Sequence, residues 1–190
     1  ALDGSFVVVG APFYDGDATD AGAAYVFHEL PAANGLDSTW SRSAASGSGR
    51  LGAASPAGGS LTAPDPDRFG ASVAVGGTRV MVGLPGFDDT VNRLGGGGVD
   101  IGGFRTFNKG ANTPTSFNTM IAETLDLGGN SNNSYEFGEQ TLYDPDSRTL
   151  FVAAPGQGVV YVYVNEGLYW RPVDTNPNLI GVQPLTGDSG

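Results

Sequence analysis

The chain contains no cysteine and a single histidine, His28. The first absence excludes disulfide bonds, cysteine-based metal sites and thiol catalysis. A catalytic triad or zinc site built on His28 would need partners that no spacing in the sequence identifies, so a structural histidine at a strand edge or surface is favoured. The sequence also lacks an apolar run long enough to cross a bilayer, and we therefore expect no transmembrane segment.

Positive charge is scarce. Lys and Arg together number 9 against 20 Asp and Glu, which gives a formal net charge of −11. This field repels a phosphate backbone, and no local basic stripe offsets it, so nucleic acid and anionic membranes are excluded as partners. Calcium, cationic proteins and neutral glycans remain candidate ligands.

No window of ten or more residues has sustained helical periodicity. Gly (31 residues) and Pro (12 residues) instead alternate with Val-rich runs. Turn-forming residues at short intervals between apolar runs are typical of many short strands joined by tight turns. The sequence therefore predicts an all-β fold.

A repeat of roughly 70 residues runs through the chain. Residues 2–12, 75–85 and 145–155 are similar strand-like segments, and each ends on a proline. Phe69-Gly70 and Phe137-Gly138 precede the second and third of these segments. The dipeptides Asp3-Gly4 and Gly76-Gly77 predict two-residue hairpins, because Gly accepts the positive φ that such turns need.

Further markers recur in the same order. A second strand-like run follows each proline, and an aromatic residue comes after it at Trp40, Phe117 and Trp170. Four short antiparallel strands per unit with this period predict the blade of a β-propeller. The whole chain, residues 1–190, is then a single partial propeller with units at about 1–62, 63–130 and 131–190.

These motifs resemble the FG-GAP repeat, the blade unit of integrin α-subunits and of many microbial surface proteins. One copy is residues 61–75 followed by Val82-Gly-Leu-Pro85. Residues 9–12 with 24–27 are similar, and Phe137-Gly138 with residues 153–155 is a looser copy. The resemblance implies a propeller of about seven blades, extracellular or at the cell surface, used in adhesion and ligand binding.

Three blades are fewer than closed propellers use. Such an array would leave strand edges and blade faces open. We therefore expect a fragment, completed by the remaining blades or by other protein subunits. Strand addition is one way in which a partner could complete it.

Calcium is the only metal that the sequence suggests. The Asp-rich loop that calcium-binding members of the family carry before the Pro strand is missing from the first two units. In the third unit, Asp144-Pro-Asp146-Ser-Arg148 has two carboxylates, but its Pro and Arg disfavour a calcium site. Asp15, Asp17 and Asp20 alternate on a Gly-containing loop and are the candidate ligands, with Asp88-Asp89 in the matching loop. Asp and Gly are also ordinary turn formers, which is the favoured interpretation.

No residue pattern indicates catalysis or a required cofactor. The leading hypothesis is an adhesion or assembly module that binds through the loops at 13–21, 86–97 and 30–60. A carbohydrate-binding or carbohydrate-active propeller is the alternative, with Trp40, Phe117 and Trp170 as sugar platforms, although their regular places favour blade packing. A calcium-dependent adhesin is the second alternative. Asn132 starts a glycosylation triplet compatible with secretion.

Overall fold

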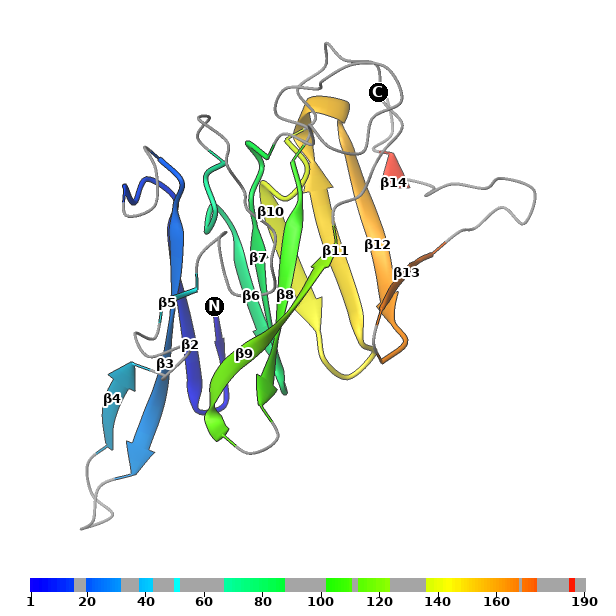
Figure 1. Cartoon of the computed structure of the whole chain (residues 1–190). Helices are drawn as coiled ribbons and strands as arrows, with labels where there is room; N and C mark the ends of the chain where they lie inside the picture. The colour runs from blue at the N-terminus through cyan, green and yellow to red at the C-terminus, as the bar shows by residue number, and fades with distance from the viewer. Residues whose placement is uncertain are drawn as a thin grey trace.

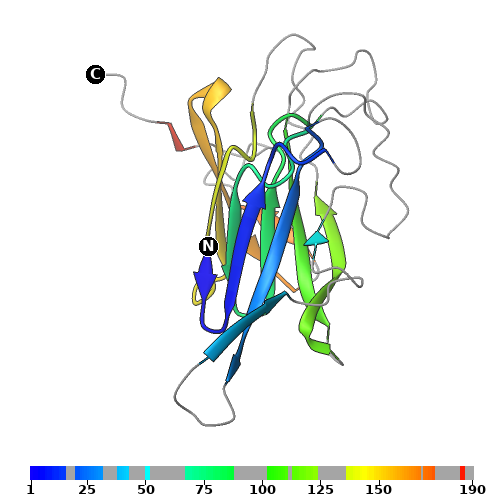
Figure 2. The same ribbon diagram turned by 90° about the vertical axis from the view of Figure 1, so that its left-hand side faces the viewer.

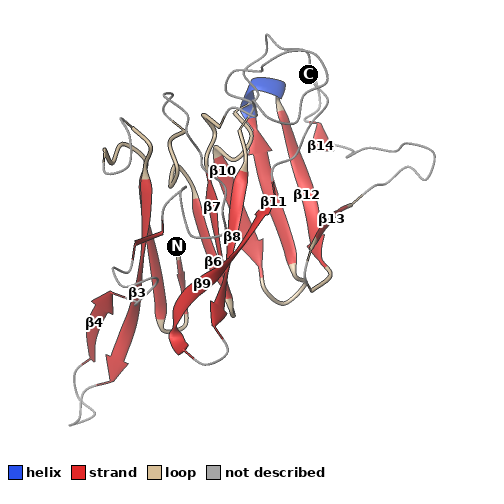
Figure 3. Cartoon of the chain, in the orientation of Figure 1, coloured by secondary structure: helices blue, strands red, loops and turns tan. Residues whose placement is uncertain are grey.

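The computed structural model describes residues 1–15, 20–31, 38–42, 50–51, 67–87, 102–110, 113–123, 136–167, 169–173 and 185–186. These residues form three antiparallel sheets (Figure 1). The one helical element among them is a single 3₁₀ turn, η1 (Pro155–Gln157), and no α-helix is present in the described part (Figure 3). The predicted all-β class is confirmed.

Each sheet follows the chain from strand to neighbouring strand, as expected for a blade. The first sheet has the order β1 (Leu2–Asp3), β2 (Phe6–Ala11), β3 (Ala23–Pro31) and β4 (Ser38–Arg42), and β5 (Arg50–Leu51) also pairs with β3. The second sheet has the order β6 (Val73–Gly76), β7 (Arg79–Gly83), β8 (Phe104–Gly110) and β9 (Thr113–Glu123).

The third sheet repeats the pattern of the first. Its order is β10 (Gln140–Asp144), β11 (Thr149–Ala154), β12 (Val159–Asn165) and β13 (Trp170–Pro172), and β14 (Leu185–Thr186) pairs with β12 as β5 pairs with β3. The unit boundaries near residues 62 and 130 lie outside the described residues. They stay predictions, as does the number of blades.

The hairpins lie one residue later than predicted. Asp3 pairs with Phe6, and Gly76 pairs with Arg79, so Gly4-Ser5 and Gly77-Thr78 are the central pairs. Gly4 has φ +52° and Gly77 has φ +56°. The glycine that takes the positive φ is therefore the first central residue, while Asp3 and Gly76 remain in the strand ladder.

The three sheets stack face to face, with the second between the other two (Figures 1 and 2). One apolar core lies between the first and second sheets and includes Val8, Val26, Phe69, Val80 and Val82. The other lies between the second and third sheets and is built on different residues, among them Met81, Phe104, Phe137, Leu150 and Val152. The second sheet thus contributes to both cores from its two faces.

The two Phe-Gly pairs occupy equivalent places. Phe69 makes a parallel bridge to Gly22, and Phe137 makes the same bridge to Gly102. Both phenylalanines are fully buried against the sheet that precedes their own. Their equivalence confirms that the sequence repeat is a structural repeat.

Candidate functional site

The loop after Pro12 is held by its own backbone. Tyr14 N–H donates to the carbonyl of Ala11 over 3.2 Å, and Gly22 N–H donates to the carbonyl of Tyr14 over 3.0 Å. These bonds join the end of β2 to the start of β3. Phe13 and Tyr14 are therefore presented from a fixed scaffold.

Two of the three predicted metal ligands can be placed on this loop. The N–H of Asp20 donates to Oδ1 of Asp15 over 2.9 Å. Asp17 lies outside the described residues, and so do Asp88 and Asp89. No group of three or more His, Cys, Asp or Glu side chains that could hold a metal ion occurs among the described residues. The calcium site stays a prediction, which a chelator-induced shift in melting temperature would test.

Aromatic side chains stand out on the same loop. Phe13 is 70% exposed and Tyr14 is 38% exposed. The Tyr14 ring packs edge-on against Tyr25 with ring centroids 6.4 Å apart, and the guanidinium of Arg50 lies 5.2 Å from the Tyr14 centroid. Tyr14 is anchored by these contacts, whereas Phe13 is mostly open to solvent. We call Phe13, Tyr14, Asp15, Asp20 and Arg50 the rim surface.

The sequence prediction covered this loop as a whole without singling out Phe13, Tyr14 or Arg50. A signal was available in the repeat. Two aromatic residues follow Pro12 directly, whereas Gly86-Phe87 and Gly156-Gln157 follow the matching prolines. Phe87 is buried, at 7% exposed, with the guanidinium of Arg105 over its ring. The comparison of equivalent loops distinguishes the first loop by its two consecutive aromatic residues, whereas the exposure of Phe13 is seen only in the structure.

The recurring aromatic residues do not share one environment. Trp170 is 4% exposed, packs edge-on against Phe104 and Tyr143, and donates its indole N–H to Oγ1 of Thr106 over 2.9 Å. Trp40 is 45% exposed on β4. The packing interpretation is confirmed for Trp170. For Trp40 it stays a prediction, because no described sheet lies against that face. Phe117 lies in β9, and its side chain is outside the described part of the chain.

Carboxylates of the third sheet serve turns. Asp144 accepts hydrogen bonds from the hydroxyl of Ser147 over 2.6 Å and from the N–H of Asp146 over 3.0 Å. These hydrogen bonds hold the pKa of Asp144 below its usual range, and the bond from the Ser147 hydroxyl makes the largest contribution. The carboxylate thus closes the turn between β10 and β11, the role that local hydrogen bonding gives Asp in turns.

A second carboxylate closes the next turn. Glu166 forms a hydrogen-bonded ion pair with Arg171 and accepts a hydrogen bond from the hydroxyl of Tyr169 over 2.7 Å. Arg171 is the largest cause of a lowered pKa at Glu166. The arrangement spans the turn from β12 to β13 and shows no second carboxylate facing it among the described residues.

His28 lies in β3, opposite Phe6 on β2 and Ser41 on β4. It is partly buried, and its Nδ1 atom has no hydrogen-bond partner in the described part of the chain. In the described ranges, therefore, no Asp or Ser side chain orients the imidazole. Its place in the middle of a three-strand ladder is that of a structural side chain.

Comparison with known proteins identifies one repeat directly. No helix among the described residues is long and apolar enough to span a membrane. A search of curated proteins found no match to the chain. The family model for the FG-GAP repeat matches residues 1–27, which include β1, the hairpin at Gly4, β2, the loop after Pro12 and the first part of β3. Residues 1–27 of this chain are an FG-GAP repeat.

Proposed function

We propose that this chain is a non-catalytic adhesion or assembly module, extracellular or at the cell surface, that binds another protein through the rim surface. FG-GAP repeats are typical of adhesion and binding propellers, and residues 1–27 supply both the match and most of the rim surface. A rigid blade with an exposed loop is a common way to combine a fixed scaffold with a binding surface.

Phe13 is the observation that carries this proposal. The Phe13 side chain is 70% exposed, so a partner that covers it gains binding free energy from the removal of apolar surface from water. Aromatic residues also dominate the energetics of protein interfaces. Tyr14, the next residue in the chain, and Arg50, which stacks on the Tyr14 ring, are also residue types enriched in such surfaces. The net charge of −11 favours a partner with a basic surface around the aromatic contact.

The test selects binders from a random-peptide library displayed on phage against the immobilised chain. Phe13→Ala is expected to weaken the selected binders roughly thirtyfold, the loss typical of an aromatic anchor. Leu2→Ala is the matched control, because Leu2 is 68% exposed but lies on β1, outside the rim surface. Binders that tolerate Phe13→Ala and Tyr14→Ala would count against the rim surface.

The extracellular placement is tested separately. A tagged chain expressed in its source cells is expected to be degraded when protease is added to intact cells. Protection until the cells are broken open would contradict a surface location. This experiment does not depend on the identity of the partner.

Carbohydrate binding is a second candidate, supported by Trp40. Its indole is 45% exposed and lies opposite Glu29 in the ladder, so a sugar ring could stack on the indole while its hydroxyls donate hydrogen bonds to the Glu29 carboxylate. Neutral oligosaccharides are expected to shift the fluorescence of Trp40, and the shift should disappear in Trp40→Phe. No shift across a broad panel of neutral sugars would remove this candidate.

A further inference from the structure

The chain shows twice how one blade receives the next. At the first sheet, Gly70 lies so close to Gly10 that a Cβ on Gly10 would overlap the Gly70 carbonyl oxygen. At the second sheet, a Cβ on Gly83 would overlap the carbonyl oxygen of Gly138 in the same way. We call each of these contacts, with the buried Phe beside it, a Phe-Gly seat.

The second seat shows which positions form it. Gly83 is the second residue before Pro85, and its ladder partner on β8 is Phe104. On the β6 side, the hydroxyl of Ser72 donates to the carbonyl of Gly138 over 2.7 Å. Ala74 pairs with Met81, and both pack in the core that contains Phe137.

The third sheet presents the same positions on its outer face. Ala153 is the second residue before Pro155 and pairs with Gln140 on one side and Val160 on the other. Leu142 pairs with Phe151, as Ala74 pairs with Met81. By register, Gln140 corresponds to Ser72, and Val160 to Phe104.

Gly158 extends the correspondence. It follows Pro155 at the place that Gly22 and Gly102 hold in the earlier sheets, where they bridge to Phe69 and Phe137. All three glycines have a positive φ: +80° at Gly22, +81° at Gly102 and +69° at Gly158. A Cβ on Gly158 would meet nothing within 4 Å, so the approach to it is open.

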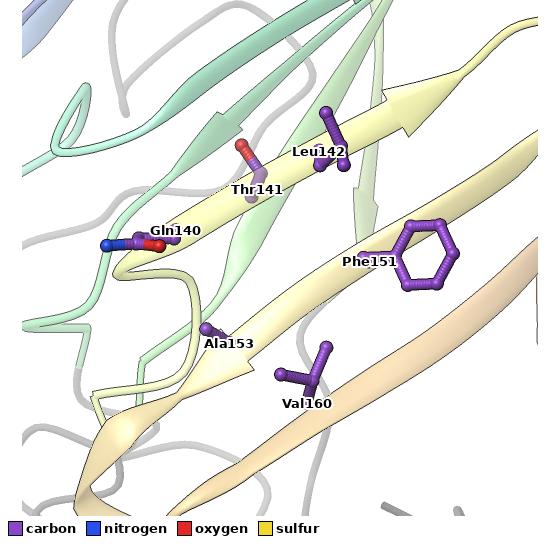
Figure 4. A pocket seen from close by; sticks show the side chains of 6 residues that line it. All are labelled: Gln140, Thr141, Leu142, Phe151, Ala153 and Val160. Carbon is purple, nitrogen blue, oxygen red and sulfur yellow. The ribbon is translucent and has the colours of Figure 1, made fainter. Parts of the chain in front are cut away.

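A cavity lies at this position. It is a hollow of about 210 Å³ that is widely open to solvent, and Figure 4 shows the side chains of β10, β11 and β12 that line it. This is below the range of small-molecule sites, which suits one inserted side chain better than a free ligand. Leu142 is 66% exposed at its edge. The lining is uncharged in a strongly acidic chain and consists of Gln140, Thr141, Leu142, Phe151, Ala153 and Val160.

Two features distinguish this seat from the internal ones. Ala153 has a Cβ where Gly10 and Gly83 have none, so an incoming glycine must remain farther from the sheet. The turn from Pro155 to Gly158 is a single 3₁₀ turn, whereas longer loops join the matching residues of the other units. Both features reduce close backbone contact, and a looser contact dissociates more readily.

We propose that the outer face of the third sheet is a reversible docking seat for a Phe-Gly segment of an FG-GAP-type blade in a separate polypeptide. The phenylalanine enters the cavity beside Phe151, and the amide of Gln140 donates to the carbonyl of the following glycine, as Ser72 does internally. A second copy of this chain is a poor donor, because its Phe69 and Phe137 are fully buried. The proposal does not depend on the rim surface.

The test uses the full chain and a capped fluorescent peptide of residues 67–75, which contains Phe69-Gly70. Fluorescence polarisation is expected to show saturable binding that weakens about thirtyfold when the peptide carries Phe69→Ala. Ala153→Gly in the chain should tighten binding about tenfold, because it removes the overlapping methyl group. Phe151→Asp should abolish binding.

Val9→Asp is the matched control. Val9 is 47% exposed on the outer face of the first sheet, so this variant places the same charge on the opposite end of the stack and should leave binding unchanged. Circular dichroism verifies that each variant is folded. No saturable binding, or equal loss in Val9→Asp and Phe151→Asp, would overturn the proposal.

A cross-linking experiment on the unmodified chain avoids any dependence on variants. A peptide with a photoreactive benzophenone at position 69 is expected to label Leu142, Phe151 or Val160. Labelling at Val8 or Met81 would show exchange into the internal seats and would refute the outer seat. Concentration-dependent dimers that Phe151→Asp removes would identify a second copy as the occupant and would refute the choice of a separate blade.

Discussion

The second and third sheets place the same repeat in different surroundings. In β7, the consecutive residues Val80, Met81 and Val82 are all fully buried, because sheets cover both faces. In β11, Leu150 and Val152 are fully buried while Phe151 between them is partly exposed. In both strands, successive side chains point to opposite faces of the sheet. Whether a position becomes core or surface is therefore decided by the neighbouring sheet and not by the strand itself.

Gly83→Ala should have the largest effect on this comparison. The new Cβ would overlap the carbonyl oxygen of Gly138 and the hydroxyl of Ser72, and backbone cannot move aside as a flexible side chain can. We expect the free energy of unfolding to fall by at least about 4 kcal/mol, measured by urea denaturation. Ala153→Gly, at the matching position of the third sheet, should cost only about 1 kcal/mol. A similar loss in both would disprove the difference between the seats.

Met81→Ala should have the next largest effect. Met81 is fully buried between the second and third sheets, so its truncation leaves a cavity and costs about 3 kcal/mol. Phe151→Ala, at the equivalent position of β11, should cost far less because its ring is already partly in water. Thermal and urea unfolding of both variants measure the difference. If Phe151→Ala proved the more damaging, the outer face would have to be covered in solution.

Trp170→Phe probes the contact between the second and third sheets. It removes the indole N–H and leaves the buried hydroxyl of Thr106 without that donor, at a cost of about 2 kcal/mol. Trp40→Phe should change stability by less than about 0.5 kcal/mol. The chain has two tryptophans, so each variant also isolates the emission of the other. Trp40 emission should be quenched readily by acrylamide and Trp170 emission weakly; the reverse pattern would contradict the burial of Trp170.

Ser147→Ala should have the smallest effect, confined to the turn between β10 and β11. The hydroxyl of Ser147 is the largest cause of the lowered pKa at Asp144, so its loss should raise that pKa toward the ordinary value of 3.8. A lowered pKa stabilises the folded state above the ordinary value and loses this contribution as pH falls through the folded value. The difference in the free energy of unfolding between variant and parent should thus be present at neutral pH and vanish in strong acid.

NMR titration of the Asp144 carboxyl measures this shift directly. Ser147→Thr retains a hydroxyl and should preserve the lowered pKa. An unchanged pKa in Ser147→Ala would mean that the backbone N–H groups of Asp146 and Ser147 account for it.

The sequence was sufficient to predict the fold class, the repeat and the equivalence of Phe69 and Phe137. It succeeded there because strand pattern and turn residues act locally, and both are repeated. It placed the hairpins one residue early at Asp3 and Gly76, because a Gly next to a turn does not itself reveal which residue takes the positive φ.

Trp40 and Ala153 could not be interpreted from the sequence for a different reason. Trp40 and Trp170 hold similar places in their units, and only the presence of an adjoining sheet separates an exposed indole from a buried one. Ala153 differs from Gly83 by one methyl group, which has no consequence until the register shows that a neighbouring backbone should pass there. Both are properties of the packing between blades.

The glycine contacts between sheets have a consequence for how such repeats can diverge. Main chain meets main chain at Gly10 and Gly83, so the distance from each blade to the next is set by atoms that every residue shares. The apolar side chains elsewhere only have to fill the remaining gap, and Val8 and Met81 do so with different shapes at the same repeat position. A fixed spacer made of backbone allows the filling to drift in sequence while the geometry of the array is preserved.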